Sequence, residues 1–195
     1  MRNSKSDTDR RRRRHRRRIQ VVIIYAAIAV GLAWFFESQA TTTIIFVRHA
    51  EKAVAPADNP GLSEAGKLRA AELARQLVDA DVVAGVDAIY STSYRRTEET
   101  VQPIANALDI PIRSYDASNT ETIMDEIVSD HKGNIVLVVG HSNTIPSLIG
   151  NMGASKKVPE ISENEYDNIY VVSIPWFGKT KTIRLRYGAP YVVAQ

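Results

Sequence analysis

Two histidines each follow a short apolar stretch, and their residue type and position suit them to catalysis. His49 follows residues 43–48, and His141 follows residues 134–140. Both stretches are rich in β-branched side chains, as buried parallel strands are. In open α/β sheets, ligands bind beyond the carboxyl ends of the strands. We therefore expect both imidazoles and Arg48 on one rim of a sheet, where they would form a site for an anion, most simply a phosphoryl group.

A third segment, residues 90–100, adds two more cations to the same rim. It reads Tyr-Ser-Thr-Ser-Tyr-Arg-Arg-Thr-Glu-Glu-Thr and places Arg95 and Arg96 at the start of an expected helix. The free N–H groups and the dipole of a helix N-terminus favour anions. Arginines there disfavour the helix itself, which indicates that a negatively charged ligand offsets their cost.

These three motifs, in this order, resemble the histidine phosphatase superfamily, branch 1, whose members are phosphoglycerate-mutase-like. The family's Arg-His-Gly appears as Arg-His-Ala at residues 48–50, a variant also common among small phosphohistidine phosphatases. Residues 62–66 resemble its Leu-Thr-x-x-Gly segment, with Ser63 in place of threonine. Residues 91–100 resemble its Ser-x-x-x-Arg-Arg-Ala-x-Gln-Thr pattern, with Thr97 and Glu99 in place of alanine and glutamine. The second pattern makes Arg96 rather than Arg95 the pocket arginine. The second histidine of the family falls on His141, and the resemblance covers about residues 43–152.

The resemblance implies a phosphatase that acts on phosphomonoesters or phosphoproteins through a covalent phosphohistidine. His49 would attack phosphorus, since a neutral imidazole with a pKa near ~6.5 is a competent nucleophile. Arg48, Arg96 and His141 would hold the phosphoryl oxygens, so that neither a metal nor another cofactor is needed. Ser142 and Asn143 are expected either to contact substrate or to cap the next helix.

The proton donor to the leaving group is less clearly indicated. Related mutases and bisphosphatases carry a Gly-x-x-Glu-Gly type segment that this sequence lacks. Asp116 falls in the corresponding stretch and is our candidate, with Glu51 and Glu121 as alternatives. Without a positioned donor, the enzyme would favour substrates with good leaving groups.

Two other functions remain open from the sequence. One is a phosphoglycerate-mutase-like phosphotransferase, and the other is a membrane-anchored protein that binds phosphorylated ligands without catalysis. Only 44 residues separate Arg96 from His141. This leaves no room for a large lid to keep a bisphosphate intermediate from water, which favours a phosphatase.

The elements expected around these motifs alternate between strand and helix, which predicts a three-layer α/β sandwich with a mostly parallel central sheet. The predicted strands are residues 42–47, 86–90, 110–113 and 134–139. The predicted helices are residues 64–79 after a Ser63 cap, 94–108 with a kink or early break at Pro103, 120–130 and 144–151. Residues 169–174 and 180–186 predict a hairpin at a sheet edge, joined by Pro175-Trp176-Phe177-Gly178.

The charge of the chain is unevenly distributed. Residues 1–18 hold ten basic and two acidic side chains, or +8, which leaves 15 basic and 20 acidic side chains, or −5, for the rest. The basic character therefore belongs to the tail, and we do not expect nucleic acid as a partner. A content of 44% hydrophobic residues suffices for one domain, and the absence of cysteine excludes disulfides, zinc–thiolate sites and thiol catalysis.

The tail leads directly into an apolar segment, residues 19–36. As a helix its 18 residues would span about 27 Å, close to the thickness of a bilayer's hydrocarbon core. We predict a basic cytoplasmic tail (1–18), a transmembrane anchor (19–36), a linker (37–41) and a catalytic domain (42–195) in the periplasm or outside the cell. The alternative is a signal peptide cleaved after Ser38-Gln39-Ala40, which would release a secreted domain.

Overall fold

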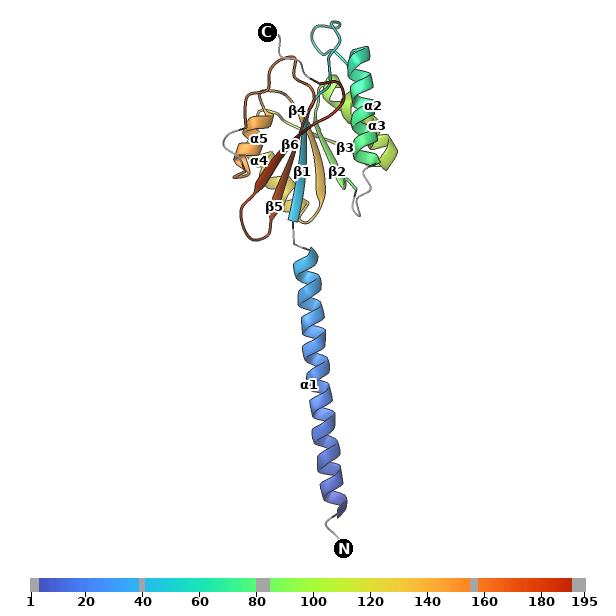
Figure 1. The fold of residues 1–195 in the computed structure, drawn as a ribbon, viewed down its shortest axis with the longest axis vertical. Helices are drawn as coiled ribbons and strands as arrows, with labels where there is room; N and C mark the ends of the chain where they lie inside the picture. The colour runs from blue at the N-terminus through green and yellow to red at the C-terminus, as the bar shows by residue number, and fades with distance from the viewer. Residues whose placement is uncertain (1–3, 39–40, 80–84, 155–157, 191–195) are drawn as a thin grey trace. The chain divides into compact units, whose positions relative to one another are not determined.

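The computed structural model describes residues 4–38, 41–79, 85–154 and 158–190. The chain divides into two units, Met1–Ala40 and Thr41–Gln195. The first unit contains helix α1 (Ser4–Ser38), and the second is an α/β domain (Figure 1).

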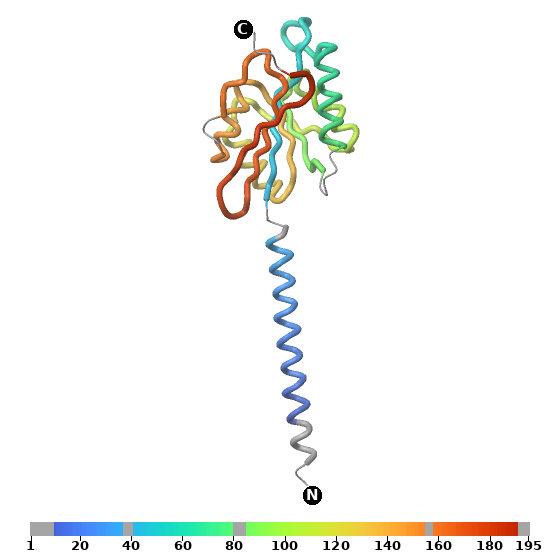
Figure 2. Tube along the Cα trace, in the orientation of Figure 1, coloured from blue at the N-terminus to red at the C-terminus, as the bar shows by residue number. Residues whose placement is uncertain are grey.

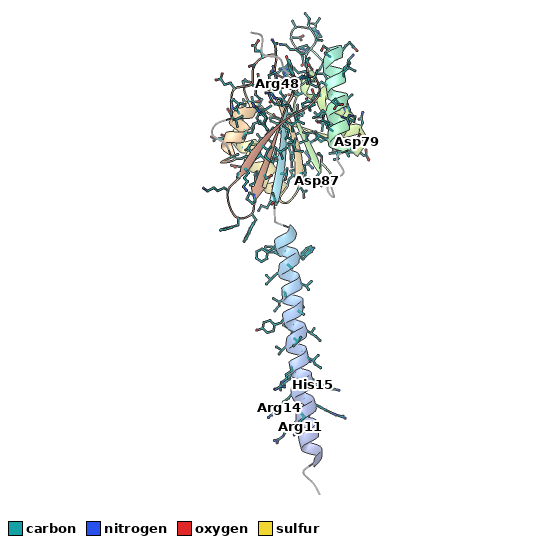
Figure 3. All side chains as sticks on the ribbon, viewed as in Figure 1. Arg11, Arg14, His15, Arg48, Asp79 and Asp87 are labelled. Atoms are coloured by element: carbon teal, nitrogen blue, oxygen red, sulfur yellow. The ribbon has the colours of Figure 1, made fainter. Side chains whose placement is uncertain are left out.

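Helix α1 carries the arginine block and the apolar segment without interruption. Every described side chain from residue 10 to residue 36 is exposed, and Arg11, Arg14 and His15 project from the helix in Figure 3. By length and composition, its segment Arg10–Phe36 could cross a membrane, and the most apolar 18 residues within it have a mean hydropathy of 2.3. A signal sequence has the same properties, so both predicted roles of this segment stand. Gln39 and Ala40 of the candidate cleavage site lie outside the described residues.

The sheet of the second unit has the strand order β3-β2-β4-β1-β5-β6 within the described residues. The strands are β1 (Thr41–Arg48), β2 (Ala88–Thr92), β3 (Ile112–Tyr115), β4 (Ile135–Gly140), β5 (Asn168–Pro175) and β6 (Lys181–Arg186). Strands β3, β2, β4 and β1 pair in parallel, whereas β5 pairs antiparallel with both β1 and β6. The sheet is therefore mixed, with the predicted hairpin of β5 and β6 at one edge.

Helices cover both faces of this sheet. Helices α2 (Glu64–Val78) and α3 (Arg95–Leu108) pack on one face, and α4 (Thr120–Asp130) and α5 (Ile145–Asn151) on the other (Figure 1). Successive side chains of β1 alternate between the two resulting cores, with Phe46 in one and Val47 in the other. Because both faces are buried, β4 is apolar throughout and β1 is apolar from Ile44 to Val47.

The helix boundaries follow local sequence signals. Ser63 caps α2 by accepting a hydrogen bond from the Gly66 amide at 3.1 Å. A Cβ at Gly66 would lie 2.2 Å from the Glu51 carbonyl oxygen, so glycine lets α2 start directly against the residues that follow β1. Helix α3 continues through Pro103 to Leu108, and the early break expected there does not occur.

The two histidine-bearing strands are neighbours and end at the same rim. Arg48 pairs in parallel register with Gly140, and the His49 amide donates to the Gly140 carbonyl at 3.0 Å. In Figure 3 Arg48 lies at this end of the sheet, whereas Asp87, just before β2, lies at the other. The loops of residues 51–62 and 158–167 lie at the same end as Arg48 (Figure 2).

Candidate active site

A pocket of about 970 Å³ opens at this rim. Every predicted site residue except the alternative proton donors lines it: Arg48, His49, Arg96, Asp116, His141, Ser142 and Asn143. The pocket is also lined by residues from the 51–62 loop, including Lys52 and Asp58, so this loop borders the rim. Arg95 instead pairs with Glu99 on the helix surface at 2.9 Å.

The His49 ring is held in one tautomer by the chain that follows it. Its Nδ1 lies 2.8 Å from the Ala50 carbonyl oxygen, which can only accept, so Nδ1 carries the proton. The Ala50 amide in turn donates to the Thr100 hydroxyl at 2.9 Å, which fixes this turn against α3. The Nε2 atom therefore has a lone pair, which is the requirement for a nucleophile.

The His141 ring is held in the opposite tautomer. The Thr97 hydroxyl lies 2.7 Å from the Tyr94 carbonyl, and its single proton is donated to a backbone carbonyl. Toward Thr92 it can therefore only accept, so the Thr92 hydroxyl donates to it at 2.9 Å. The Thr92 oxygen then accepts from Nε2–H of His141 at 3.1 Å. Arg96, which can only donate, contacts Nδ1 at 3.5 Å and agrees with this assignment.

Arg48 is a buried cation in contact with carbonyls rather than carboxylates. Only 6% of its surface is exposed, and its Nη1 donates to the carbonyls of Ser162 at 2.7 Å and Glu165 at 3.1 Å. Its Nε has no hydrogen-bond partner, and among the described residues no carboxylate lies within ion-pair distance. The guanidinium carbon lies 4.2 Å from the ring centroid of Tyr166. A buried charge without a counter-ion is costly, so this arrangement favours an anionic ligand.

Arg96 reaches the pocket from the first turn of α3. Its guanidinium carbon lies 4.3 Å from the ring centroid of Tyr94, the N-cap residue of that helix. Tyr94 also meets the His141 ring edge-on, with centroids 5.3 Å apart. These ring contacts restrict the orientation of the guanidinium, which favours preorganised binding of an anion.

Both histidines are neutral at pH 7. Burial, together with the charges of Arg48, His141 and Arg96, lowers the pKa of His49 to about 3, although its hydrogen bond to Ala50 opposes this shift. Burial and the same two arginines lower the pKa of His141 to about 4. The two ring centroids are 5.4 Å apart. The site thus holds two arginine cations and two uncharged imidazoles.

Comparison with known proteins finds a family that this chain resembles. Residues 44–119 match the profile of the histidine phosphatase superfamily (branch 1). Residues 44–119, which include Arg48, His49 and Arg96, thus resemble this superfamily. No curated protein matches it in sequence.

Solved structures of a protein histidine phosphatase, a sugar-phosphoglycerate phosphatase and a phosphoglycerate mutase have the same fold. The protein histidine phosphatase SixA, solved with tungstate, is 16% identical with a TM-score of 0.59, covering 74% of this chain and 96% of its own. A mycobacterial glucosyl-3-phosphoglycerate phosphatase is 13% identical with a TM-score of 0.57, covering 76% of this chain and 99% of its own. Phosphoglycerate mutase from Plasmodium falciparum is 17% identical with a TM-score of 0.56, covering 80% of this chain and 98% of its own.

The candidate proton donors of this protein differ in their surroundings. Asp116 lines the pocket, and its carboxylate accepts from the Ser118 amide at 2.8 Å, which lowers its pKa. Glu51 is held by Arg69, whose Nε lies 2.8 Å from one carboxylate oxygen and 3.0 Å from the other. Neither Glu51 nor Glu121 lines the pocket.

Several residues at the site went unassigned in the sequence analysis. Thr92 was visible as a polar residue at the end of a strand on the correct rim, so its position could have marked it. Tyr166 has no such signal, because it belongs to an irregular loop. Arg48 holds this loop through hydrogen bonds to its backbone carbonyls. His131 does not line the pocket; it lies in the turn after α4 and is buried, with Nε2 3.0 Å from the Tyr90 hydroxyl. Within the described ranges no group of three or more His, Asp or Glu side chains could hold a metal ion.

Proposed function

We propose that this protein is a metal-independent phosphatase that hydrolyses phosphomonoesters or phosphoproteins through a phosphohistidine at His49. The observation that carries this proposal is the pairing of a fixed Nδ1–H tautomer at His49 with a buried, unpaired Arg48 beside it. The first provides a nucleophilic lone pair, and the second provides the charge that holds the phosphoryl group. A fixed nucleophile next to a fixed cation is suited to in-line phosphoryl transfer.

In the first step, Nε2 of His49 attacks phosphorus while the bond between phosphorus and the leaving oxygen breaks. Arg48 and Arg96 bind the equatorial oxygens as charge spreads over them. The leaving oxygen takes a proton from an acid in the pocket. In the second step, water attacks phosphorus, gives its proton to the same group, and the P–N bond breaks to release inorganic phosphate and the free imidazole.

His141 changes its protonation state when substrate binds in this scheme. In the free enzyme its Nδ1 has a lone pair, which would repel a phosphoryl oxygen. A bound dianion raises the pKa of a neighbouring imidazole because it stabilises the positive charge. His141 therefore takes a proton, in effect from the monoanionic form of the substrate, and donates a hydrogen bond from Nδ1. Thr92 holds Nε2 in both states.

Asp116 is the proton donor that we propose. Its hydrogen bond to the Ser118 amide lowers its pKa and so opposes this role in the free enzyme. A bound phosphoryl dianion acts in the opposite direction, since like charge disfavours the carboxylate. Ser142 and Asn143, which line the same pocket, are proposed substrate contacts.

A phosphatase fits these observations better than the alternatives. The pocket is open to solvent, whereas a mutase must shield its intermediate from water. A non-catalytic binding protein would need the two arginines but would have no use for the fixed tautomer of His49. The test is turnover of p-nitrophenyl phosphate by the full chain in detergent. We expect release of inorganic phosphate that EDTA does not reduce, and isomerisation of phosphoglycerate without phosphate release would favour the mutase.

We further propose that residues 19–36 anchor the enzyme in a membrane, with residues 1–18 in the cytoplasm and the catalytic domain on the other side. The support is the length and hydropathy of the apolar segment and the arginine block before it. A phosphatase reporter fused after Gln195 should be active if the domain is exported. Resistance of the full-length chain to alkaline extraction from membranes would separate an anchor from a cleaved signal peptide.

The proposed proton donor predicts an effect that depends on the leaving group. Asp116→Asn should slow hydrolysis of an alkyl phosphate by about 10²-fold, because a poor leaving group needs its proton. Hydrolysis of p-nitrophenyl phosphate should change far less. Asp58→Asn is the matched control, because Asp58 also lines the pocket. Equal losses with both substrates in the Asp116 variant would remove it as the donor.

A further inference from the structure

The turn between β5 and β6 exposes two aromatic side chains at the end of the sheet opposite the pocket. Phe177 is 88% exposed and Trp176 is 63% exposed. Gly178 has a φ of +119°, which only glycine adopts readily, so the turn has a defined backbone shape. The Thr180 hydroxyl donates to the Met152 carbonyl at 3.4 Å, which ties the turn to the end of α5. The turn is thus a fixed structure with an apolar tip.

The register of the sheet places this tip beside the first residue of β1. Pro175, the last residue of β5, pairs with Thr41, the first residue of β1. Paired residues on antiparallel strands lie about 5 Å apart. Figure 1 shows the β5–β6 turn and the start of β1 at the same end of the sheet.

The same residue, Thr41, lies only three positions after the end of α1 at Ser38. Three residues span at most about 11 Å, so the chain itself limits the distance between Ser38 and Thr41 to that length. If residues 19–36 cross the hydrocarbon core, Ser38 falls in the headgroup layer. The tether alone therefore keeps the aromatic tip within reach of the membrane surface.

The chemistry of the tip suits such a surface. Aromatic side chains, tryptophan above all, are favoured at the boundary between hydrocarbon and headgroups. Lys179 and Lys181 flank the aromatic pair, and an ammonium group next to an apolar tip can bind anionic lipid headgroups. Val54 is another exposed apolar side chain, but it lies in the loop at the pocket end of the domain and is not part of this turn.

We propose that the β5–β6 turn, residues 175–181, is a membrane-docking element that inserts Trp176 and Phe177 into the interfacial layer of the bilayer. This inference rests on the proposed membrane anchor. With both the anchor and the turn on the bilayer, the domain is held at two points. Strand β1 runs about 23 Å from Thr41 to Arg48, so the docked domain presents its pocket away from the lipid surface.

The test uses the full chain with Trp34→Phe, which leaves Trp176 as the single tryptophan. The protein is reconstituted in vesicles of phosphatidylcholine with phosphatidylglycerol, and flotation establishes that it is held by the membrane. We expect Trp176 emission to be quenched by lipids brominated near the headgroup end of the acyl chain. Quenching by aqueous acrylamide should be about threefold weaker than for an indole in water, because an inserted indole is shielded from the aqueous quencher.

Two variants define the control. Phe177→Ser should expose Trp176 to acrylamide while the protein still floats with the vesicles. Leu68→Ser removes another exposed apolar side chain, 74% exposed on α2, and should leave both forms of quenching unchanged. Turnover of p-nitrophenyl phosphate should be the same in all variants, since none of these residues lines the pocket.

Other outcomes contradict the proposal in distinguishable ways. Protein that floats with vesicles while Trp176 is quenched by acrylamide and not by brominated lipid would overturn the docking element but not the anchor. Protein that fails to float would overturn both. Shielding of Trp176 that grows with the protein-to-lipid ratio would identify a second copy of the chain as the partner of the turn instead.

Discussion

His49 and His141 occupy equivalent backbone positions but have opposite hydrogen-bonding arrangements. Each follows the last residue of a buried parallel strand, and those last residues, Arg48 and Gly140, are paired in the sheet. His49 donates from Nδ1 to the Ala50 carbonyl, whereas His141 donates from Nε2 to the Thr92 hydroxyl. The sheet therefore sets where the two imidazoles lie, and their immediate neighbours set what each can do.

This difference assigns complementary chemical roles. A histidine fixed through Nδ1 presents Nε2 as a lone pair, which is a nucleophile. A histidine fixed through Nε2 keeps Nδ1 free to take a second proton once a bound dianion outweighs the charge of the nearby arginine, and it can then stabilise that anion. Both rings are kept neutral in the free protein by burial and by the two arginines. The charge of the substrate then distinguishes the two rings, because only His141 gains a hydrogen bond to the substrate when it is protonated.

The largest effect should come from replacing the proposed nucleophile. His49→Ala should reduce turnover by on the order of 10⁴- to 10⁶-fold, as removal of a nucleophile does elsewhere. The arginines remain, so the variant should still bind vanadate. Initial rates with p-nitrophenyl phosphate measure the loss, and near-normal turnover would show that His49 has another role.

The histidines should also fail to titrate in the neutral range. Both pKa values lie well below 6.5, so each ring stays neutral between pH 5 and 8. For His49, the protonation equilibrium is displaced by on the order of 10³-fold from that of a free imidazole. Nitrogen-15 spectra should show Nδ1–H at His49 and Nε2–H at His141. A midpoint near pH 6.5 for either ring, or the same tautomer in both, would break the contrast between them.

The same pKa values fix the sign of a stability effect. Between pH 6.5 and about 4, the unfolded chain binds protons at these histidines more readily than the folded chain does. Their contribution to the free energy of unfolding is therefore negligible above pH 6.5 and becomes destabilising as the pH falls through this window.

Replacing the second histidine should have an intermediate effect. His141→Ala removes one preorganised donor to the phosphoryl oxygens, which should cost on the order of 10²–10³-fold in kcat. Phosphate should still become attached to His49. A loss as large as that of His49→Ala, with no phosphoenzyme, would show that the two histidines share one function.

The smallest effect should come from the hydroxyl that orients His141. Thr92→Val keeps the side-chain shape but removes the acceptor for Nε2–H, which should lower kcat by about tenfold, the equivalent of one hydrogen bond. The nitrogen-15 spectrum should show His141 losing its single tautomer, and Thr92→Ser should restore both. Reduced activity with an unchanged tautomer would mean that Thr92 acts on packing alone.

Much of this structure was predictable because the responsible signals are local. The apolar stretches, the Ser63 cap and the spacing of the helices predicted the elements to within a residue or two, and two strand ends predicted the rim. The tautomer of His141 was not predictable, because Thr92 meets it only through the pairing of β2 with β4. The contact between Tyr166 and Arg48 was not predictable either. It depends on a loop that Arg48 holds through backbone carbonyls, and these carry no side-chain signature.

The most direct test of the central claim is to locate the covalent phosphate. Full-length protein would be mixed with p-nitrophenyl phosphate, quenched in alkaline denaturant to preserve an N-linked phosphate, and mapped by peptide mass spectrometry. We expect phosphate on His49 in the wild-type chain and in His141→Ala, and none in His49→Ala. Phosphate on His141, or turnover with no phosphorylated histidine at any time before steady state, would contradict the assignment of His49 as nucleophile.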